Sequence, residues 1–139
     1  MKKPSSLRSI SLIAGSLAAL ALITSGCSSV ALDKQGDMEA TYVAGEFRML
    51  VNGNAPATAA ATSAAFKQLG LFQIKSTQDI YSATLRARTP KDEKVTVGIA
   101  EVNSRQTMVR IRVDIIGDKN FSRKLYEQID RNLSSGGGS

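Results

Sequence analysis

The side chains that could do acid/base or ligand chemistry in this chain are mainly one cysteine, 18 basic and 12 acidic residues, and the 139 residues include no histidine. Histidine-based catalytic triads and histidine-containing zinc sites are therefore excluded. Four-cysteine clusters are excluded as well, and a single cysteine cannot form a disulfide within the chain. We expect no catalytic, cofactor-binding or metal-binding residue, and hence a protein that is not an enzyme.

The remaining acid/base and nucleophile candidates do not change that expectation. Glu101 and Asp114 have the right chemistry for a general acid and base, but nothing in their spacing places them together. Without histidine, a serine nucleophile would need a lysine partner, and no Ser-x-x-Lys sequence occurs. The glycines at 136–138 follow a predicted helix instead of a strand, so they do not form a phosphate-binding loop.

Two Arg-x-Arg sequences form the most distinctive concentration of charge. Alternate side chains of a β-strand point to opposite faces, so each sequence places both arginines on the same face. We expect the open face of a sheet to carry the candidate anion-binding or partner-binding residues Arg86, Arg88, Arg110 and Arg112, with Thr84 and Lys75 beside them. Guanidinium groups bind phosphate and carboxylate through paired hydrogen bonds, which favours an acidic protein, an acidic polymer or an anionic lipid as partner.

The same arginines also fit an antiparallel sheet whose polar side simply meets water. In that interpretation Glu46 and Asp114 balance their charge across neighbouring strands, and no partner is required. The sequence leaves both interpretations open.

Residues 1–26 have the layout of a secretory signal peptide. Lys2, Lys3 and Arg8 form a basic start, a charge-free apolar run extends from Ile10 to Ile23, and small residues follow. A membrane-spanning helix needs about 20 mostly apolar residues, and this run is shorter. We therefore expect a cleaved leader.

The only cysteine follows this run directly, in Leu22-Ile23-Thr24-Ser25-Gly26-Cys27, which resembles the lipobox of bacterial lipoproteins. The commonest lipobox has leucine where this chain has Thr24. The resemblance implies that Cys27 is acylated, that cleavage occurs just before it, and that two or more acyl chains anchor the protein to the lipid bilayer. Ser28 after the cysteine implies sorting to the outer membrane of a Gram-negative bacterium, facing the periplasm.

Removal of the leader lowers the basic side chains from 18 to 15 against 12 acidic ones, which leaves a net charge of about +3. So small a charge does not argue for nucleic acid, and the few aromatic residues do not suggest a stacking platform. We expect no nucleic-acid partner. Residues 27–40 have no steady hydrophobic period and are expected to be the lipidated cysteine and a tether.

The elements that must position the arginines follow from hydrophobic periodicity. β-Formers over Tyr42–Val51 predict a first strand, and four further strands follow from period-two alternation. Their apolar positions are Phe72 and Ile74; Ala83, Leu85 and Ala87; Val95, Val97 and Ile99; and Val109, Ile111, Val113 and Ile115. The short polar connections between them suit antiparallel hairpins.

Two helices complete the expected domain, residues 41–134. Asn54 can cap an Ala-rich helix over Ala57–Leu69 that Gly70 ends, and Asp118 can cap a second helix with apolar residues at intervals of four. The apolar faces of both helices must be buried, so we expect both helices to pack on the same, apolar side of the sheet. We therefore predict an α+β fold of order β-α-β-β-β-β-α, with a five-stranded antiparallel sheet, both helices on one face, and a flexible tail over 135–139.

Several segments together resemble a family of small bacterial lipoproteins that carry a domain of unknown function. They are the lipobox cysteine, Tyr42-Val43-Ala44-Gly45-Glu46-Phe47, the Ala-rich helix ending Leu69-Gly70-Leu71, Ile116-Gly117-Asp118, Ser122-Arg123, and Tyr126 through Ile129. The resemblance implies the anchor and the α+β domain, and it implies no catalytic residue and no substrate.

Two functions of different classes remain. The first is a membrane-anchored, non-catalytic interaction module of the cell envelope, whose open face or edge strand binds an envelope protein or polymer. The second is a small-ligand or lipid-binding protein, in which the small side chains of Ala57 to Ala65 leave a groove against the sheet. An apolar pocket would favour the second, and a filled core with an exposed basic or apolar patch would favour the first, which is the interpretation that we prefer.

Overall fold

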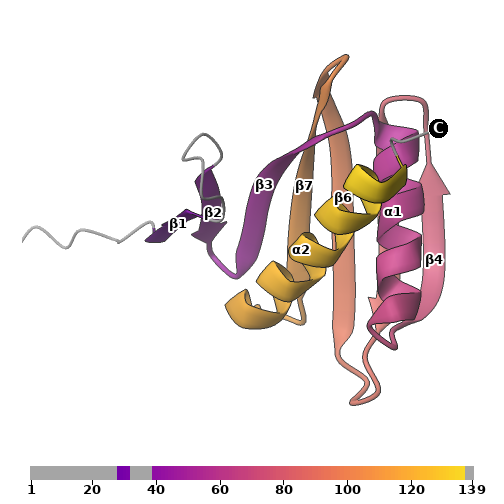
Figure 1. Cartoon of the computed structure of the whole chain (residues 1–139). Helices are drawn as coiled ribbons and strands as arrows, with labels where there is room; N and C mark the ends of the chain where they lie inside the picture. The colour runs from indigo at the N-terminus through magenta and orange to yellow at the C-terminus, as the bar shows by residue number, and fades with distance from the viewer. Residues whose placement is uncertain (1–27, 32–38, 137–139) are drawn as a thin grey trace, which may run out of the picture.

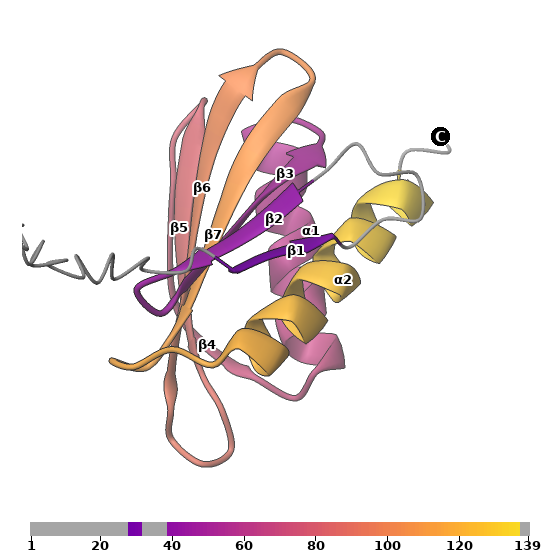
Figure 2. The same ribbon diagram turned by 90° about the vertical axis from the view of Figure 1, so that its left-hand side faces the viewer.

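A computed structural model of the chain describes residues 28–31 and 39–136. The chain forms an antiparallel sheet with both helices on one face, and Figure 2 shows the two layers from the side. The expected leader, Cys27 and residues 137–139 lie outside the described part of the chain.

The sheet has the strand order β1-β2-β3-β7-β6-β5-β4. Along the chain, α1 lies between β3 and β4, and α2 follows β7 (Figure 1). All neighbouring strands are antiparallel. The elements are β1 (Ser28–Ala31), β2 (Glu39–Val43), β3 (Glu46–Asn52), α1 (Ala55–Gln68), β4 (Phe72–Gln78), β5 (Ser82–Arg88), β6 (Lys94–Asn103), β7 (Gln106–Val113) and α2 (Lys119–Gly136).

The expected count of five strands is wrong, because the predicted first strand is a hairpin. The chain turns at Ala44 and Gly45, so that β2 and β3 form two strands within Tyr42–Val51. Both residues have positive φ, 50° and 78°, which is the geometry of a type I′ turn. Six strands, β2 to β7, therefore form the main sheet, and the short strand β1 extends its edge to seven.

The expected tether and tail are also partly ordered. Ser28 to Ala31 pair with β2 instead of forming an irregular tether, because the edge of β2 offers unpaired backbone groups. At the other end of the domain, α2 continues as far as Gly136, two residues into the expected flexible tail.

Two isoleucines that we expected in the alternating core positions are exposed. Ile74 lies at a register shift between Gln73 and Lys75, where an extra residue disrupts the pairing of β4 with β5. Ile115 is outside β7, because Asp114 adopts a φ of 54° and ends the strand at Val113. Phe72, the other expected core position of β4, is also exposed, because β4 is the edge strand and all of its residues are exposed. The alternation holds on β5, β6 and β7, where Leu85, Val97 and Ile111 are fully buried.

The first helix has the expected capping residues, but it begins at Ala55, two residues before the expected start, and ends at Gln68. The side chain of Asn54 accepts a hydrogen bond from the Ala57 backbone N–H at 2.9 Å, and Pro56 lies in the first turn. The helix ends before Gly70, whose φ is 72°, and the Leu71 N–H donates back to the Phe66 carbonyl at 2.8 Å. Its small buried residues allow α1 to lie close over β4, β5 and β6.

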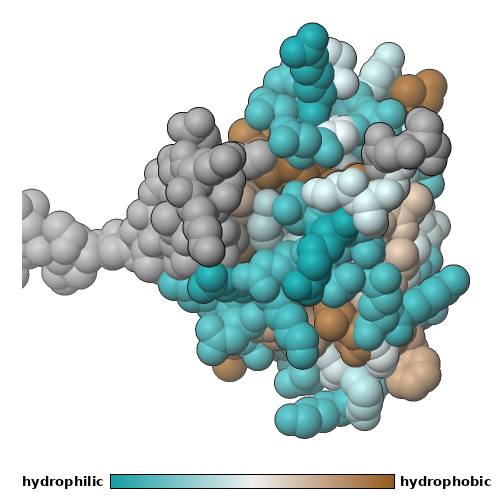
Figure 3. All heavy atoms as spheres, in the orientation of Figure 1, coloured by the Kyte–Doolittle hydropathy of each residue, from teal (hydrophilic) through white to brown (hydrophobic). Residues whose placement is uncertain are grey.

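The second helix covers the other half of the same sheet face. Asp118 caps it by accepting from the Phe121 backbone N–H at 2.9 Å, as expected. It contacts β3, β7 and α1, and the Tyr126 ring lies 5.7 Å from the Phe47 ring. Leu125 and Ile129 are fully buried, which confirms the predicted apolar face. Hydrophilic side chains cover most of the helix-bearing side shown in Figure 3.

We expect Leu125→Ala to lower the free energy of unfolding by about 2–5 kcal/mol, because the shortened side chain leaves a cavity between α2 and the sheet. This is a large part of the roughly 5–15 kcal/mol that holds a domain folded. Urea denaturation measures the change. The neighbouring exposed residue supplies the control, and Lys124→Ala should shift stability by no more than about 0.5 kcal/mol. Equal effects of the two substitutions would contradict the burial of this face.

Candidate functional site: the open face of the sheet

The face of the sheet opposite the helices carries the four predicted arginines. Arg86 and Arg88 lie on β5, and Arg110 and Arg112 lie on β7, while the residues between them are buried under the helices. Lys75 pairs with Arg86 across β4 and β5, so it lies beside the cluster as expected. We call the side chains of Arg48, Lys75, Arg86, Arg88, Arg110 and Arg112 the basic face.

Strand β6 separates the two arginine pairs. Thr96 lies opposite Arg86 on one side and Arg112 on the other, and Gly98 lies between Thr84 and Arg110 in the same way. Neighbouring strands are about 4.8 Å apart, so the arginine pairs are about 10 Å apart across β6. The arginines therefore flank a strip of small side chains and do not converge on one point.

The strip between the arginines is hollowed. A hollow of about 200 Å³ lies over β6, where Gly98 and Ala100 have little or no side chain, and Arg110 and Met108 line one side. A second hollow of about 220 Å³ is lined by Lys75, Thr77, Thr84 and Arg86. Thr84 lines both, so the two hollows are adjacent. Hydroxyl, guanidinium and ammonium groups are the donors that bind acidic oxygens.

Acidic side chains neutralise only part of the basic face. Glu46 contacts Arg48 at 2.6 Å and Arg112 at 4.0 Å, as expected for a counter-charge on β3. Arg88 is bound to Asp92 in the following turn at 2.8 Å. Within residues 28–31 and 39–136, no ion pair involves Arg86, Arg110 or Lys75. These three cations are therefore the ones left for an external anion.

Asp114 does not balance the arginines as we expected. It lies in the turn after β7, and its backbone N–H donates to the Lys94 carbonyl at 2.6 Å. The ion pairs of the described residues do not include its carboxylate. The reason is the positive φ of Asp114, which takes the chain out of the strand geometry that would have placed this side chain on the open face.

Arg48 belongs to the basic face, and sequence reasoning missed it. It lies opposite Arg110 on the β3–β7 pair, and its guanidinium contacts Glu46. The sequence does not show that β3 lies beside β7, because this pairing joins segments about 60 residues apart in the chain. An alternation of charged and apolar residues over Glu46–Asn52 was the available signal.

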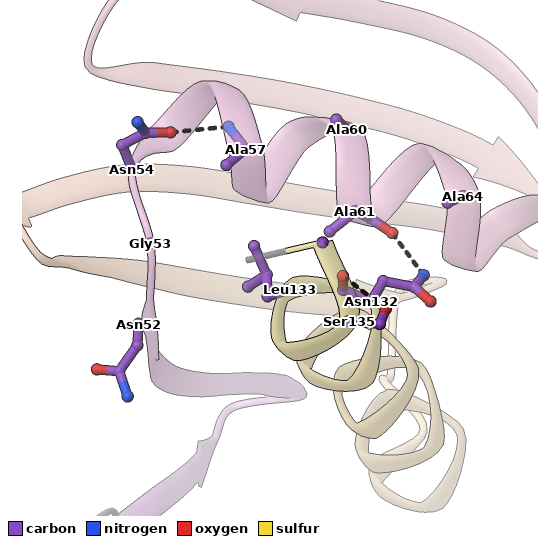
Figure 4. Close-up of a pocket in the computed structure, with 11 residues that line it drawn as sticks. Asn52, Gly53, Asn54, Ala57, Ala60, Ala61, Ala64, Asn132, Leu133 and Ser135 are labelled. Atoms are coloured by element: carbon purple, nitrogen blue, oxygen red, sulfur yellow. Dashed lines mark hydrogen bonds between the residues drawn. The ribbon is translucent and has the colours of Figure 1, made fainter. Parts of the chain in front are cut away.

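A second concavity lies on the helix side, at the open end between α1 and α2. Its volume is about 620 Å³, and Figure 4 shows Ala57, Ala60, Ala61 and Ala64 along one wall. Leu133 and Ser135 of α2 lie across from them, with Asn52 and Gly53 at one end. The groove therefore forms between the helices, whereas we expected it between the helix and the sheet. Asn132 closes part of it by donating to the Ala61 carbonyl at 3.0 Å.

Glu101 and Asp114, the two carboxylates considered as an acid/base pair, do not come together. Glu101 accepts a hydrogen bond from the Ala55 N–H at 2.9 Å, so it caps α1 at one end of the sheet, while Asp114 lies at the other end. Among residues 28–31 and 39–136, no group of three or more potential metal ligands is close enough to hold an ion. The helices in the described part of the chain are too short or too polar to cross a membrane.

The architecture and the open face together define a small two-layer α+β domain with a basic surface on its open sheet face. The chain belongs to the family described as "Protein of unknown function (DUF3568)", whose family model matches residues 10–132. The matched region starts at the apolar N-terminal run and includes Cys27, all of α1 and α2 as far as Asn132. No curated protein matches the chain.

Proposed function

We propose that this protein is a membrane-anchored, non-catalytic interaction module of the bacterial cell envelope. Acylated Cys27 holds it on the periplasmic side of the outer membrane, and the basic face binds an acidic protein or polymer of the envelope. The lipobox-like sequence before Cys27 supports the anchor, and the family match that begins at residue 10 is consistent with an N-terminal segment shared by the family.

The observation that carries the interaction part is the incomplete neutralisation of the basic face. Arg86, Arg110 and Lys75 border hollows with hydroxyl groups and have no acidic partner within the described residues. A surface that only needed solubility would work equally well with mixed charges. Unpaired arginines on a rigid sheet instead offer preformed donors to carboxylate or phosphate groups, so that little conformational entropy is lost on binding.

A second candidate function is the binding of a small apolar ligand in the groove between the helices. Its size of about 620 Å³ and its alanine-lined wall favour this function. The groove is open at its end, however, and Asn132 and Gln128 join the two helices through hydrogen bonds to Gln68 at 2.9 and 2.8 Å. Ligand sites usually enclose most of the ligand, so we favour the interaction module.

Replacing Arg86, Arg88, Arg110 and Arg112 together with glutamine tests the basic face. We expect the fold and thermal midpoint to be retained, because exposed ion pairs contribute little to stability. Binding to an acidic polymer, such as polyglutamate or lipopolysaccharide, should weaken at least about tenfold, since each surface cation contributes about 1 kcal/mol to attraction toward an anionic surface. The wild-type interaction should also weaken as salt is raised. Titration by biolayer interferometry measures both effects.

The matched control removes the same charge from the helix side. Lys67, Arg123, Lys124 and Arg131 are exposed on α1 and α2, and their joint replacement by glutamine lowers the net charge equally. This control should bind within about threefold of wild type if position matters more than net charge. Equal losses in both variants would leave only a nonspecific charge effect and would contradict a role for the basic face.

A further inference from the structure

We propose that the loop carrying Ile115 and Ile116 enters the lipid bilayer beside the acyl chains of Cys27 and so sets the orientation of the domain on the membrane. This inference rests on the proposed anchor and adds a second contact to it. The partner of this apolar surface is the lipid of the membrane that holds the proposed acyl anchor. That anchor is attached next to Ser28, the first residue of β1.

The two isoleucines are the most exposed large apolar side chains of the described residues, at 85% and 88%. They follow each other in the loop between β7 and α2, and they contribute almost nothing to the core. The loop after β7 differs in this respect from the turns at 89–93 and 103–106, which consist mostly of polar residues. Adjacent exposed isoleucines at a loop tip bury well in the boundary between headgroups and acyl chains.

The loop lies against the turn of the β2–β3 hairpin. A Cβ added at Gly45 would meet the Ile116 carbonyl, and a Cβ added at Gly117 would meet Gly45 and the Tyr42 hydroxyl, each closer than 3.0 Å. The backbones of the two segments are therefore in direct contact. Val43, which begins this hairpin turn, is 37% exposed and adds a third apolar side chain.

The anchor leaves the sheet at this same end. Ser28, the residue after Cys27, pairs with Tyr42, and Tyr42 is only one residue from the exposed Val43. Consecutive Cα atoms are 3.8 Å apart, so an anchor on residue 27 is attached within one peptide unit of this pair. An anchor attached here brings the end of the sheet that carries Ile115 and Ile116 to the bilayer surface.

Charge does not provide the attraction at this end. The charged side chains at this end of the sheet balance: they are Arg88, Lys91, Lys94, Arg112 and Lys119 against Glu46, Asp92, Glu93, Asp114 and Asp118. We therefore expect a hydrophobic contact that persists at high salt. With this end on the bilayer, the strands rise from the membrane and the basic face points sideways, toward a protein or polymer and away from the lipid.

The experiment uses the full acylated protein in vesicles of neutral phosphatidylcholine. Because Cys27 is the only cysteine and its thiol is acylated, Ile116→Cys introduces one free thiol. Val102→Cys is the matched control, since Val102 is 58% exposed on β6 at the opposite end of the sheet. The rate of reaction with a membrane-impermeant maleimide is measured for each variant on vesicles and in detergent-free solution after proteolytic release from Cys27.

On vesicles, the thiol at position 116 should react at least about tenfold more slowly than the thiol at 102, because burial of one such side chain corresponds to about that shift in equilibrium. The protection should remain at about 1 M salt and disappear on release. Equal rates in a protein that sediments with the vesicles would overturn the inference and leave the anchor standing. A protein that stays in the supernatant would contradict the anchor and the inference together.

Discussion

Cys27→Ser should abolish labelling of the protein by a fatty-acid probe and remove it from the outer-membrane fraction. In the proposed anchor the acyl group is attached through the thiol, which serine lacks, so the variant can no longer be acylated. Each buried methylene contributes about 0.8 kcal/mol to membrane binding, and loss of two or more acyl chains therefore removes the anchor. Metabolic labelling with an alkynyl fatty acid, followed by cell fractionation, measures both outcomes. The variant should accumulate as an uncleaved precursor or as released protein.

The residue after the cysteine offers a matched variant that keeps the thiol. Ser28→Asp should leave labelling intact and move the protein from the outer to the inner membrane, because serine at this position implies outer-membrane sorting in lipoproteins of this kind. Labelling of Cys27→Ser at the wild-type level would contradict acylation of this cysteine. Unchanged sorting of Ser28→Asp would contradict only the assignment to the outer membrane.

Gly117→Ala should destabilise the domain by at least about 3 kcal/mol. Two costs add at this position. The φ of 87° lies in the left-handed region, where a residue with a Cβ is strained by about 1–2 kcal/mol. The added Cβ would also overlap with the Gly45 backbone, closer than 3.0 Å, and a backbone contact cannot be relieved by rotating a side chain. Chemical denaturation with circular dichroism measures the loss.

Two other glycines separate these costs. Gly70 has a φ of 72° and nothing within 4 Å of an added Cβ, so Gly70→Ala should lose only about 1 kcal/mol. The nearest atom to a Cβ at Gly98 is 3.9 Å away, in ordinary contact, and its φ is not positive, so Gly98→Ala should be neutral or stabilise by up to about 1 kcal/mol. A loss at Gly117 no larger than at Gly70 would show that the hairpin and the loop separate without cost.

The β2–β3 hairpin shows why the strand count could not be predicted from alternation. Ala44 and Gly45 lie inside a stretch that is otherwise rich in β-formers, and the usual Asn-Gly or Asp-Gly signal of a type I′ turn is absent. The turn is specified by a tertiary contact instead, since Gly45 lies directly against Ile116 and Gly117. By contrast, both helix caps depend on local residues, Asn54 and Asp118, and both were predicted correctly.

Strand alternation predicted part of the basic face, namely the side of the sheet on which each arginine lies. Alternation fixes which side of a strand a residue occupies, so the four arginines of β5 and β7 were placed correctly on the open face. It does not give the strand order, which brings Arg48 into the face and puts β6 between the arginine pairs. It also fails where a single backbone angle ends a strand, as at Asp114, and this is why Ile115 was expected in the core.

The pairing of β3 with β7 has a consequence for how the chain folds. Strands β4 to β7 follow one another as hairpins and need only short loops to close, whereas β3 must bring Glu46 to Arg112 across α1 and the whole meander. Loop-closure entropy makes such distant contacts slow to form. The sheet therefore cannot be completed until β7 is available, and a chain threaded through a translocation channel from its N-terminus stays unfolded until nearly all of it has emerged. This late closure would keep an exported precursor in the extended state that passage through such a channel requires.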